Sequence, residues 1–263
     1  MSNQDIEMII KDLTANKREV QIDDLVSAVR REEPPAAQAV RLVDRVLDTF
    51  RQFGIREQDD EYNLKVLLGI GASYEALSVF EQATTVYHQA LELARRLNNR
   101  PSEANLLWKI GIVQRKRNRW EEALDSLHQS EEIYRSLNDE TGLAWCQVNR
   151  GIIDLECGNY EAATEAYQQA LETGQGIDNH RIIAAATMNL GILATIRGDF
   201  DEATVHYRNC LALYEQLKHA VSIARAYHNL GMCHLARQSW TEALDAFEKS
   251  LKISQARGDL RQS

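Results

Sequence analysis

The chain has 263 residues, of which 44% are hydrophobic and 26% are charged, and this composition predicts a folded globular protein rather than a disordered or fibrous one. Its formal net charge of −9 argues against a nucleic-acid partner, because binding to phosphates requires a clustered basic surface. No apolar run approaches the roughly 18 residues that a membrane span needs, so we expect a cytoplasmic protein with no membrane partner.

The first part of the chain, residues 1–58, is expected to form an N-terminal helical segment and cap. A helix is predicted over residues 36–53, which follow two prolines and end before Gly54, because proline favours the first turn of a helix and glycine its end. This helix would cover the first hairpin of the region that follows. Apolar residues around Ile9 and Val26 indicate two shorter helices before it.

Five segments of the remaining chain repeat with a period of 40 residues, and we expect them to form one solenoid over residues 59–259. Each segment carries a glycine, then an aromatic residue after a turn signal, then an alanine. The glycines are Gly71, Gly111, Gly151, Gly191 and Gly231, the aromatic residues are Phe80, Trp120, Tyr160, Phe200 and Trp240, and the alanines are Ala83, Ala123, Ala163, Ala203 and Ala243. Small residues at fixed positions let two helices approach closely, and the turn divides each repeat into two helices.

Apolar residues around each turn recur three and four residues apart, as in Trp240, Leu244, Phe247 and Leu251. This spacing is typical of an amphipathic helix and not of a strand. The sequence therefore predicts an all-α fold, a right-handed α-α superhelix (solenoid) of five helical hairpins.

The repeated pattern resembles the tetratricopeptide repeat, in a variant of about 40 residues that is similar to the repeats of Pins-type adaptors, kinesin light chains and bacterial regulatory proteins. The resemblance covers about residues 62–259. In such a stack the first helix of each repeat lines the inner, concave surface. The resemblance implies a groove that binds another protein or a peptide.

A polar row is predicted along that groove. Asn149, Asn189 and Asn229 stand two residues before the repeat glycine, and Lys109 has the same place in the second repeat. An Asn amide offers both a donor and an acceptor, as an extended peptide backbone does. We therefore predict that these residues bind peptide, and the alternative is that each Asn bonds a local backbone group or ties neighbouring helices together.

An apolar floor is predicted one residue beyond each glycine, with Trp145 at its edge. Its members are Ile112, Ile152, Ile192 and Met232. An apolar floor with spaced amides suits a peptide, but packing between repeats would explain the same residues equally well.

Seven basic residues lie on first helices or in the turns after them, and they favour an acidic ligand. They are Lys65, Lys109, Arg115, Lys116, Arg117, Arg119 and Arg225. The alternative for residues 115–119 is a solvated charged run.

The third repeat is irregular, because Arg150 stands where other repeats have Leu or Ile before the glycine. Asp154 follows four residues later on the same helix face, and Glu131 replaces a leucine in the preceding second helix. We predict a partly buried structural ionic cluster of these three residues, since a lone buried charge is costly. Recognition of a ligand charge or local bending would be the alternatives.

No sequence motif for catalysis is present: the chain has no phosphate-binding loop and no metalloprotease or serine-hydrolase signature. We therefore expect no catalytic residues, no cofactor and no enzyme activity. His228, Cys233 and His234 have spacings that do not place them on one helix face, so no metal site is predicted. The four cysteines show no metal-binding spacing and are expected to be reduced structural thiols within helices.

The pattern runs out at residues 260–263, which would begin a further repeat or form a tail. No polar capping helix follows, so Leu251 and Ile253 are expected to be uncovered. Three explanations stay open: the sequence is part of a longer protein, the surface pairs with another copy, or the last helix tolerates exposure.

The leading functional hypothesis is a protein-protein interaction scaffold that binds an extended peptide or partner segment, acidic or amphipathic, in the concave groove. The first alternative is a sensory or regulatory module that controls an effector domain outside this chain. The second is a self-assembling structural solenoid, a homo-oligomer formed through the uncapped end.

Overall fold

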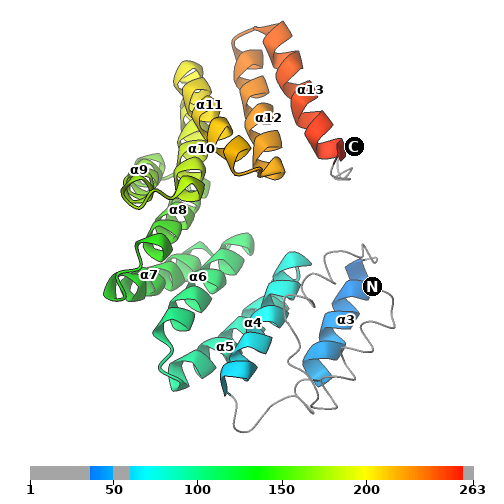
Figure 1. Ribbon diagram of the computed structural model, residues 1–263, viewed down its shortest axis with the longest axis vertical. Helices are drawn as coiled ribbons and strands as arrows, with labels where there is room; N and C mark the ends of the chain where they lie inside the picture. The colour runs from blue at the N-terminus through cyan, green and yellow to red at the C-terminus, as the bar shows by residue number, and fades with distance from the viewer. Residues whose placement is uncertain (1–35, 50–59, 257–263) are drawn as a thin grey trace. The chain divides into compact units, whose positions relative to one another are not determined.

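The structure is a computed structural model that describes residues 36–49 and 60–256 of the chain. Within these ranges every regular element is a helix and none is a strand (Figure 1). The expected all-α architecture of consecutive helical hairpins is confirmed. The helices expected before residue 36, the end of the predicted cap helix and the predicted tail at 260–263 lie outside the described residues.

The chain divides into two compact units, Met1–Ile133 and Tyr134–Ser263. The helices described in the first unit, the last of which continues into the second, are α3 (Ala36–Thr49), α4 (Asp60–Ala76), α5 (Phe80–Arg96), α6 (Arg100–Lys116) and α7 (Trp120–Ser136). Helix α3 packs against α4, where the Tyr74 hydroxyl donates to the Asp44 carboxylate at 2.7 Å. The predicted cap helix therefore contacts the first hairpin.

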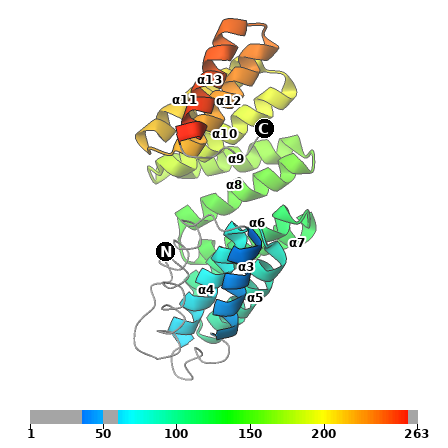
Figure 2. The same ribbon diagram turned by 90° about the vertical axis from the view of Figure 1, so that its right-hand side faces the viewer.

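The second unit contains the third, fourth and fifth hairpins. Their helices are α8 (Glu140–Glu156), α9 (Tyr160–Gly176), α10 (His180–Arg197), α11 (Phe200–Gln216), α12 (Ala220–Ala236) and α13 (Trp240–Ala256). Helices α8 and α9 lie side by side (Figure 2), and each helix packs against the next. The first helices α8 and α10, like α10 and α12, also contact each other. Matching positions of these three first helices therefore form rows.

Every connection between the repeat helices from α4 to α13 closes in the same way. After α5, for example, Asn98 has φ 52°, its N–H donates to the Arg95 carbonyl at 3.1 Å, and the Asn99 N–H donates to the Ala94 carbonyl at 2.9 Å. This pair of bonds is the Schellman motif, in which one left-handed residue ends the helix. The left-handed residues are Ser78, Asn98, Asn118, Asn138, Gly158, Asp178, Gly198, Lys218 and Gln238.

The repeat glycines hold the two helices of each hairpin close together. A Cβ atom added to Gly191 would lie 2.8 Å from Cε1 of Tyr207, and one added to Gly151 would lie 2.6 Å from the same atom of Tyr167. Both tyrosine side chains are buried against the first helix of their own hairpin. The close approach predicted from the small residues is therefore present in these hairpins.

The four thiols are all free, and three of them are buried. Cys157 is exposed and forms the C-cap that follows α8. The expectation that all four cysteines are structural residues inside helices is therefore wrong for Cys157, because the helix ends one residue before it.

Candidate functional site

The candidate site is one side of the first helices α8, α10 and α12 in the second unit, which we call the first-helix face. Asn149 on this face is buried, whereas Arg225 and Met232 are exposed. The three helices present the same three positions in register. These are Trp145, Ala185 and Arg225, then Asn149, Asn189 and Asn229, then Ile152, Ile192 and Met232. In each helix the three positions are separated by four and then three residues, so they lie on one side of it.

The asparagine amides of α8 and α10 are fixed by their own helices. Nδ2 of Asn149 donates to the Trp145 carbonyl at 2.8 Å, and Nδ2 of Asn189 donates to the Ala185 carbonyl at 3.0 Å. This is the local backbone bond considered as an alternative to ligand binding. It engages one of the two amide N–H groups, and it does not use the second N–H or Oδ1.

Asn229 has a different environment in α12. Its Nδ2 lies 3.7 Å from Sδ of Met188, which belongs to α10. A thioether sulfur is a weak acceptor, so this amide is held less firmly than the other two. Met188 was not singled out in the sequence, and its position one residue before Asn189 gave no signal of this contact.

The predicted apolar floor changes along the second unit. Ile152 and Ile192 pack against buried clusters between neighbouring helices and are only partly exposed. Met232 is 45% exposed. Ile112 lies in α6 of the first unit, where it is partly buried. The isoleucines of the second unit therefore contribute to packing between repeats, while Met232 offers free apolar surface.

The first position of the face carries two large side chains, Trp145 and Arg225. Trp145 packs against the cluster that contains Val148 and Ile182. Arg225 is exposed, and its charge reaches the neighbouring helix α11. Burial raises the pKa of the Cys210 thiol to about 12, and the positive charge of Arg225 opposes that rise. One end of the face is thus aromatic and the other is cationic.

Lys109 occupies the asparagine position in the first unit. Its ammonium nitrogen lies 5.7 Å from the ring centroid of Tyr87 and 5.7 Å from that of Trp108. Both distances allow a cation-π interaction. The hydroxyl of Tyr87 in turn donates to the Glu75 carboxylate at 3.0 Å, and burial raises the pKa of that phenol.

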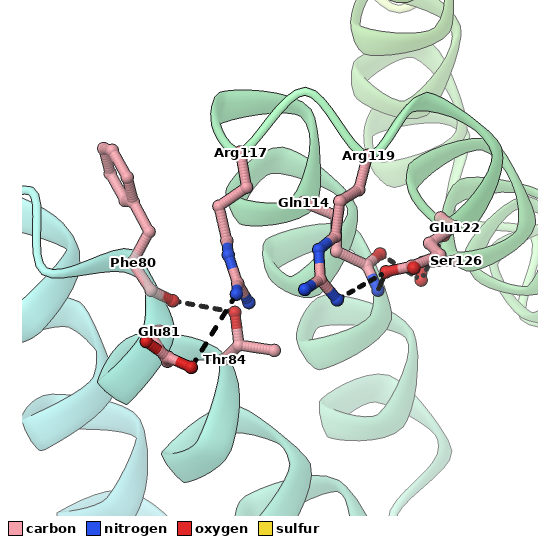
Figure 3. Close-up of polar contacts among 8 residues, drawn as sticks. All are labelled: Phe80, Glu81, Thr84, Gln114, Arg117, Arg119, Glu122 and Ser126. Carbon is pink, nitrogen blue, oxygen red and sulfur yellow. Dashed lines mark hydrogen bonds and ion pairs between the residues drawn. The ribbon is translucent and has the colours of Figure 1, made fainter.

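Three of the basic side chains near the end of α6 bind carboxylates of the same unit. Lys116 lies 3.0 Å from Glu75, Arg117 lies 4.0 Å from Glu81, and Arg119 lies 3.3 Å from Glu122. Figure 3 shows the last two contacts. Ser126 also belongs to this network, because its hydroxyl donates to the Gln114 side chain at 2.8 Å (Figure 3). Lys116 and Arg117 thus join the second hairpin to the first, whereas the Arg119 pair is local to the start of α7. Lys65 is exposed on α4.

The residues of the predicted ionic cluster belong to different units. Glu131 is buried in the first unit, and Arg150 and Asp154 are partly buried in the second. Arg150 donates from Nη2 to the Gln169 side chain at 3.1 Å. The cluster itself stays a prediction.

Within residues 36–49 and 60–256, no three His, Cys, Asp or Glu side chains are grouped so that they could hold a metal ion. Among the described helices, none combines the length and the apolar character needed to cross a bilayer.

A recurring arginine contact between hairpins was missed in the sequence. Arg237 follows α12 and reaches back to Asp201 at the start of α11, at 2.8 Å, and Arg197 at the end of α10 donates to Thr164 of α9 at 2.9 Å. Each arginine lies six residues beyond the repeat glycine, a spacing that could have indicated it.

This architecture, with paired helices, one left-handed residue per connection and rows of matching side chains, defines a helical-hairpin repeat protein. The sequence profile of the tetratricopeptide repeat matches residues 62–136, 105–176, 141–216 and 182–256. The chain therefore belongs to the tetratricopeptide-repeat family, whose members generally mediate protein-protein interactions. No curated protein sequence matches this chain.

Several solved structures share the fold. BtubC from P. vanneervenii has a TM-score of 0.64 and 18% identity over 93% of this chain and 95% of its own. Aspartyl phosphate phosphatase F from Bacillus subtilis has a TM-score of 0.71 and 14% identity over 97% and 74%. The Rap conjugation gene regulator of plasmid pLS20, solved in complex with a peptide, has a TM-score of 0.69 and 13% identity over 96% and 76%. These identities show a common fold only.

Proposed function

We propose that this protein is an interaction scaffold without catalytic activity, and that its first-helix face binds an extended segment of a partner. The partner is a protein or a peptide, and no cofactor takes part. We place this encounter in the cytosol, where free thiols such as those of this chain stay reduced.

The amide geometry of Asn149 and Asn189 carries the proposal. Because each Nδ2 is already bonded to the carbonyl four residues earlier, each Oδ1 is oriented by its helix and not by a ligand. Two acceptors in the same register on consecutive hairpins suit the N–H groups of an extended backbone. Preorganised acceptors also lower the entropy lost on binding.

The residues around these amides favour a partner segment that combines apolar residues with an acidic one. Trp145 and Met232 supply apolar surface at opposite corners of the face, and Arg225 supplies an exposed positive charge. Since Lys116, Arg117 and Arg119 already pair with carboxylates of the protein, we assign the preference for an acidic residue to Arg225. A regulator of the same fold has been solved with a bound peptide, which is consistent with this use of the fold.

A peptide-capture experiment tests the proposal. A proteome-derived peptide library is passed over the wild type and over a variant with Asn149→Ala, Asn189→Ala and Asn229→Ala. Alanine is a better helix former than asparagine, so the variant should remain folded, which circular dichroism checks. We expect the variant to lose a specific set of captured peptides.

The matched control is Asn209→Ala, which removes an exposed amide from α11. It should retain the captured set, and Arg225→Gln should selectively lose the acidic members. Equal capture by the wild type and the triple variant would contradict the role of the asparagines. Capture of nothing by either protein would favour the regulatory or the self-assembling hypothesis instead.

A further inference from the structure

The third asparagine of the first-helix face, Asn229, holds its amide differently from the other two. Asn149 and Asn189 donate from Nδ2 to the backbone carbonyl four residues earlier, at 2.8 Å and 3.0 Å. The corresponding carbonyl for Asn229 is that of Arg225. Nδ2 of Asn229 instead lies 3.7 Å from Sδ of Met188 in α10. Its amide therefore contacts the neighbouring first helix and not its own.

The residue one position before each asparagine accounts for this difference. Met188 precedes Asn189 in α10, and Val148 has the same place in α8. Both side chains are buried, and Val148 packs in a cluster with Ala186 of α10. Val148 is thus the counterpart of Met188 for the amide of Asn189, but a valine side chain has no atom that accepts a proton. Of the two residues, only Met188 gives an amide of the next helix, that of Asn229, an acceptor other than its own backbone.

The neighbours on α12 itself explain the difference less well. The position four residues before the asparagine is large in α12, where it is Arg225, but it is also large in α8, where Trp145 stands and the local bond forms. The position three residues after the asparagine is Met232 in α12 and isoleucine in the other two helices. Met232 is therefore the natural control for Met188.

The weakness of the contact with sulfur leaves the amide of Asn229 able to turn. A thioether is a poor acceptor, whereas the carbonyl oxygens of a bound segment are good ones. In an extended backbone the N–H and C=O of one residue point to the same side. An amide that is free to turn can match both groups at once, because its Oδ1 accepts and its Nδ2 donates.

We propose that Met188 is a positioning residue, which keeps the amide of Asn229 off its own helix and so lets it bind both the N–H and the C=O of one partner residue. Asn149 and Asn189, fixed by their own helices, contribute one acceptor each. This role rests on the function proposed above for the first-helix face. The partner residue opposite Asn229 cannot be proline, which has no N–H to donate.

Nuclear magnetic resonance of the side-chain amides tests the role of Met188 in the free protein. The signals of Asn229 are assigned from their loss in Asn229→Ala. Met188→Leu removes the sulfur at similar side-chain volume, so the amide should take the Arg225 carbonyl as its acceptor. Its proton signals should then move toward those of Asn149 and Asn189.

The matched control is Met232→Ile, which removes the other methionine near this amide and introduces the residue of the sister helices. It should leave the signals of Asn229 in place. Unchanged signals in Met188→Leu, or an equal change in both variants, would overturn the proposal.

The peptides that the wild type captures supply the second test, by calorimetric titration. Met188→Leu should bind them about fivefold more weakly, the effect of one neutral hydrogen bond. The double variant Met188→Leu with Asn229→Ala should bind no more weakly than Asn229→Ala alone, because Met188 acts through Asn229. A further loss in the double variant would mean that Met188 acts through packing, and the proposed role would be wrong.

The role of Met188 and the scaffold function can fail separately. If Met188→Leu binds the captured peptides as tightly as the wild type, Met188 has no positioning role and the scaffold function stands. If the wild type captures no peptide, the scaffold function fails and the double contact of Asn229 fails with it.

Discussion

The fourth and fifth hairpins follow the same sequence pattern, yet their second helices bury very different amounts of side chain. Tyr207 and Thr204 of α11 are 1% and 4% exposed, whereas Leu244 of α13 is 60% exposed and Phe247 is only partly buried. This difference in burial arises from the helix that follows each second helix. Helix α12 covers α11, and no described helix follows α13. In a repeat protein, burial at one position is set by the interface with the next repeat.

The largest expected effect of this difference is on the stability lost when the large aromatic residue of each second helix is replaced by alanine. Tyr207→Ala should lower the free energy of unfolding by about 3–5 kcal/mol, because it leaves a cavity in a closed core. Phe247→Ala should cost about half as much, since water already reaches part of that ring. Urea unfolding followed by circular dichroism measures both, and equal losses would show that the fifth hairpin is packed as tightly as the fourth.

The repeat glycines give the second comparison. In Gly191→Ala the new Cβ atom would lie 2.8 Å from the buried ring of Tyr207, and in Gly231→Ala it would lie 2.6 Å from the ring of Phe247. Overpacking lowers the free energy of unfolding by about 1–3 kcal/mol. Replacing glycine with alanine in a helix raises it by about 1 kcal/mol.

We expect Gly191→Ala to lower the free energy of unfolding by up to about 2 kcal/mol, while Gly231→Ala should be nearly neutral because Phe247 can move toward the exposed side. Thermal unfolding of the two variants measures the contrast. A larger loss at Gly231 would mean that the ring of Phe247 is held in place.

Alkaline pH should act on Tyr207 of the fourth hairpin and not on the matching residue of the fifth, Phe247. Burial raises the pKa of the Tyr207 phenol from its usual 10.0 to about 12, so from about pH 10 the unfolded chain loses a proton that the folded chain retains. The stability contributed by Tyr207 is therefore complete below pH 10 and falls as the pH rises toward 12. Phe247 has no hydroxyl to titrate at the matching position.

The variant Tyr207→Phe tests this pH dependence. It loses the hydrogen bond with Thr195, which measures 3.0 Å, and should cost about 1 kcal/mol at neutral pH. Above pH 10 the variant should lose less stability than the wild type, so the difference between them narrows in urea titrations. Tyr160→Phe, at an exposed position, is the control and should leave the pH dependence unchanged.

The periodic features of this protein could be predicted from its sequence, and the features that depend on neighbours could not. Gly191 and its equivalents, together with the aromatic residues after each turn, gave the hairpins and their period. The position of an amide such as that of Asn149 depends on whether the helix carbonyl four residues earlier accepts its proton, and an Asn in a helix is compatible with either outcome. The pairing of Arg117 with Glu81 likewise depends on how two hairpins stack.

The smallest expected change in stability comes from replacing the left-handed residue in the connections between helices. Gly198 and Gln238 both have positive φ, 85° and 59°, and they end the first helices of the fourth and fifth hairpins. A residue with a side chain is strained there by about 1 kcal/mol relative to glycine, although glycine also gives the unfolded chain more conformational freedom. Gly198→Ala should therefore lower the free energy of unfolding by about 1 kcal/mol, and Gln238→Gly should raise it by about 0.5 kcal/mol.

Chemical unfolding of the two variants, with Gln89→Gly inside α5 as a control, measures these changes. The control replaces an exposed helical residue and should lose about 1 kcal/mol. If Gln238→Gly lost as much stability as the control, the left-handed conformation at residue 238 would not be the feature that ends α12. A gain at residue 238 would instead show that this connection, like the one at Gly198, favours glycine in the left-handed conformation.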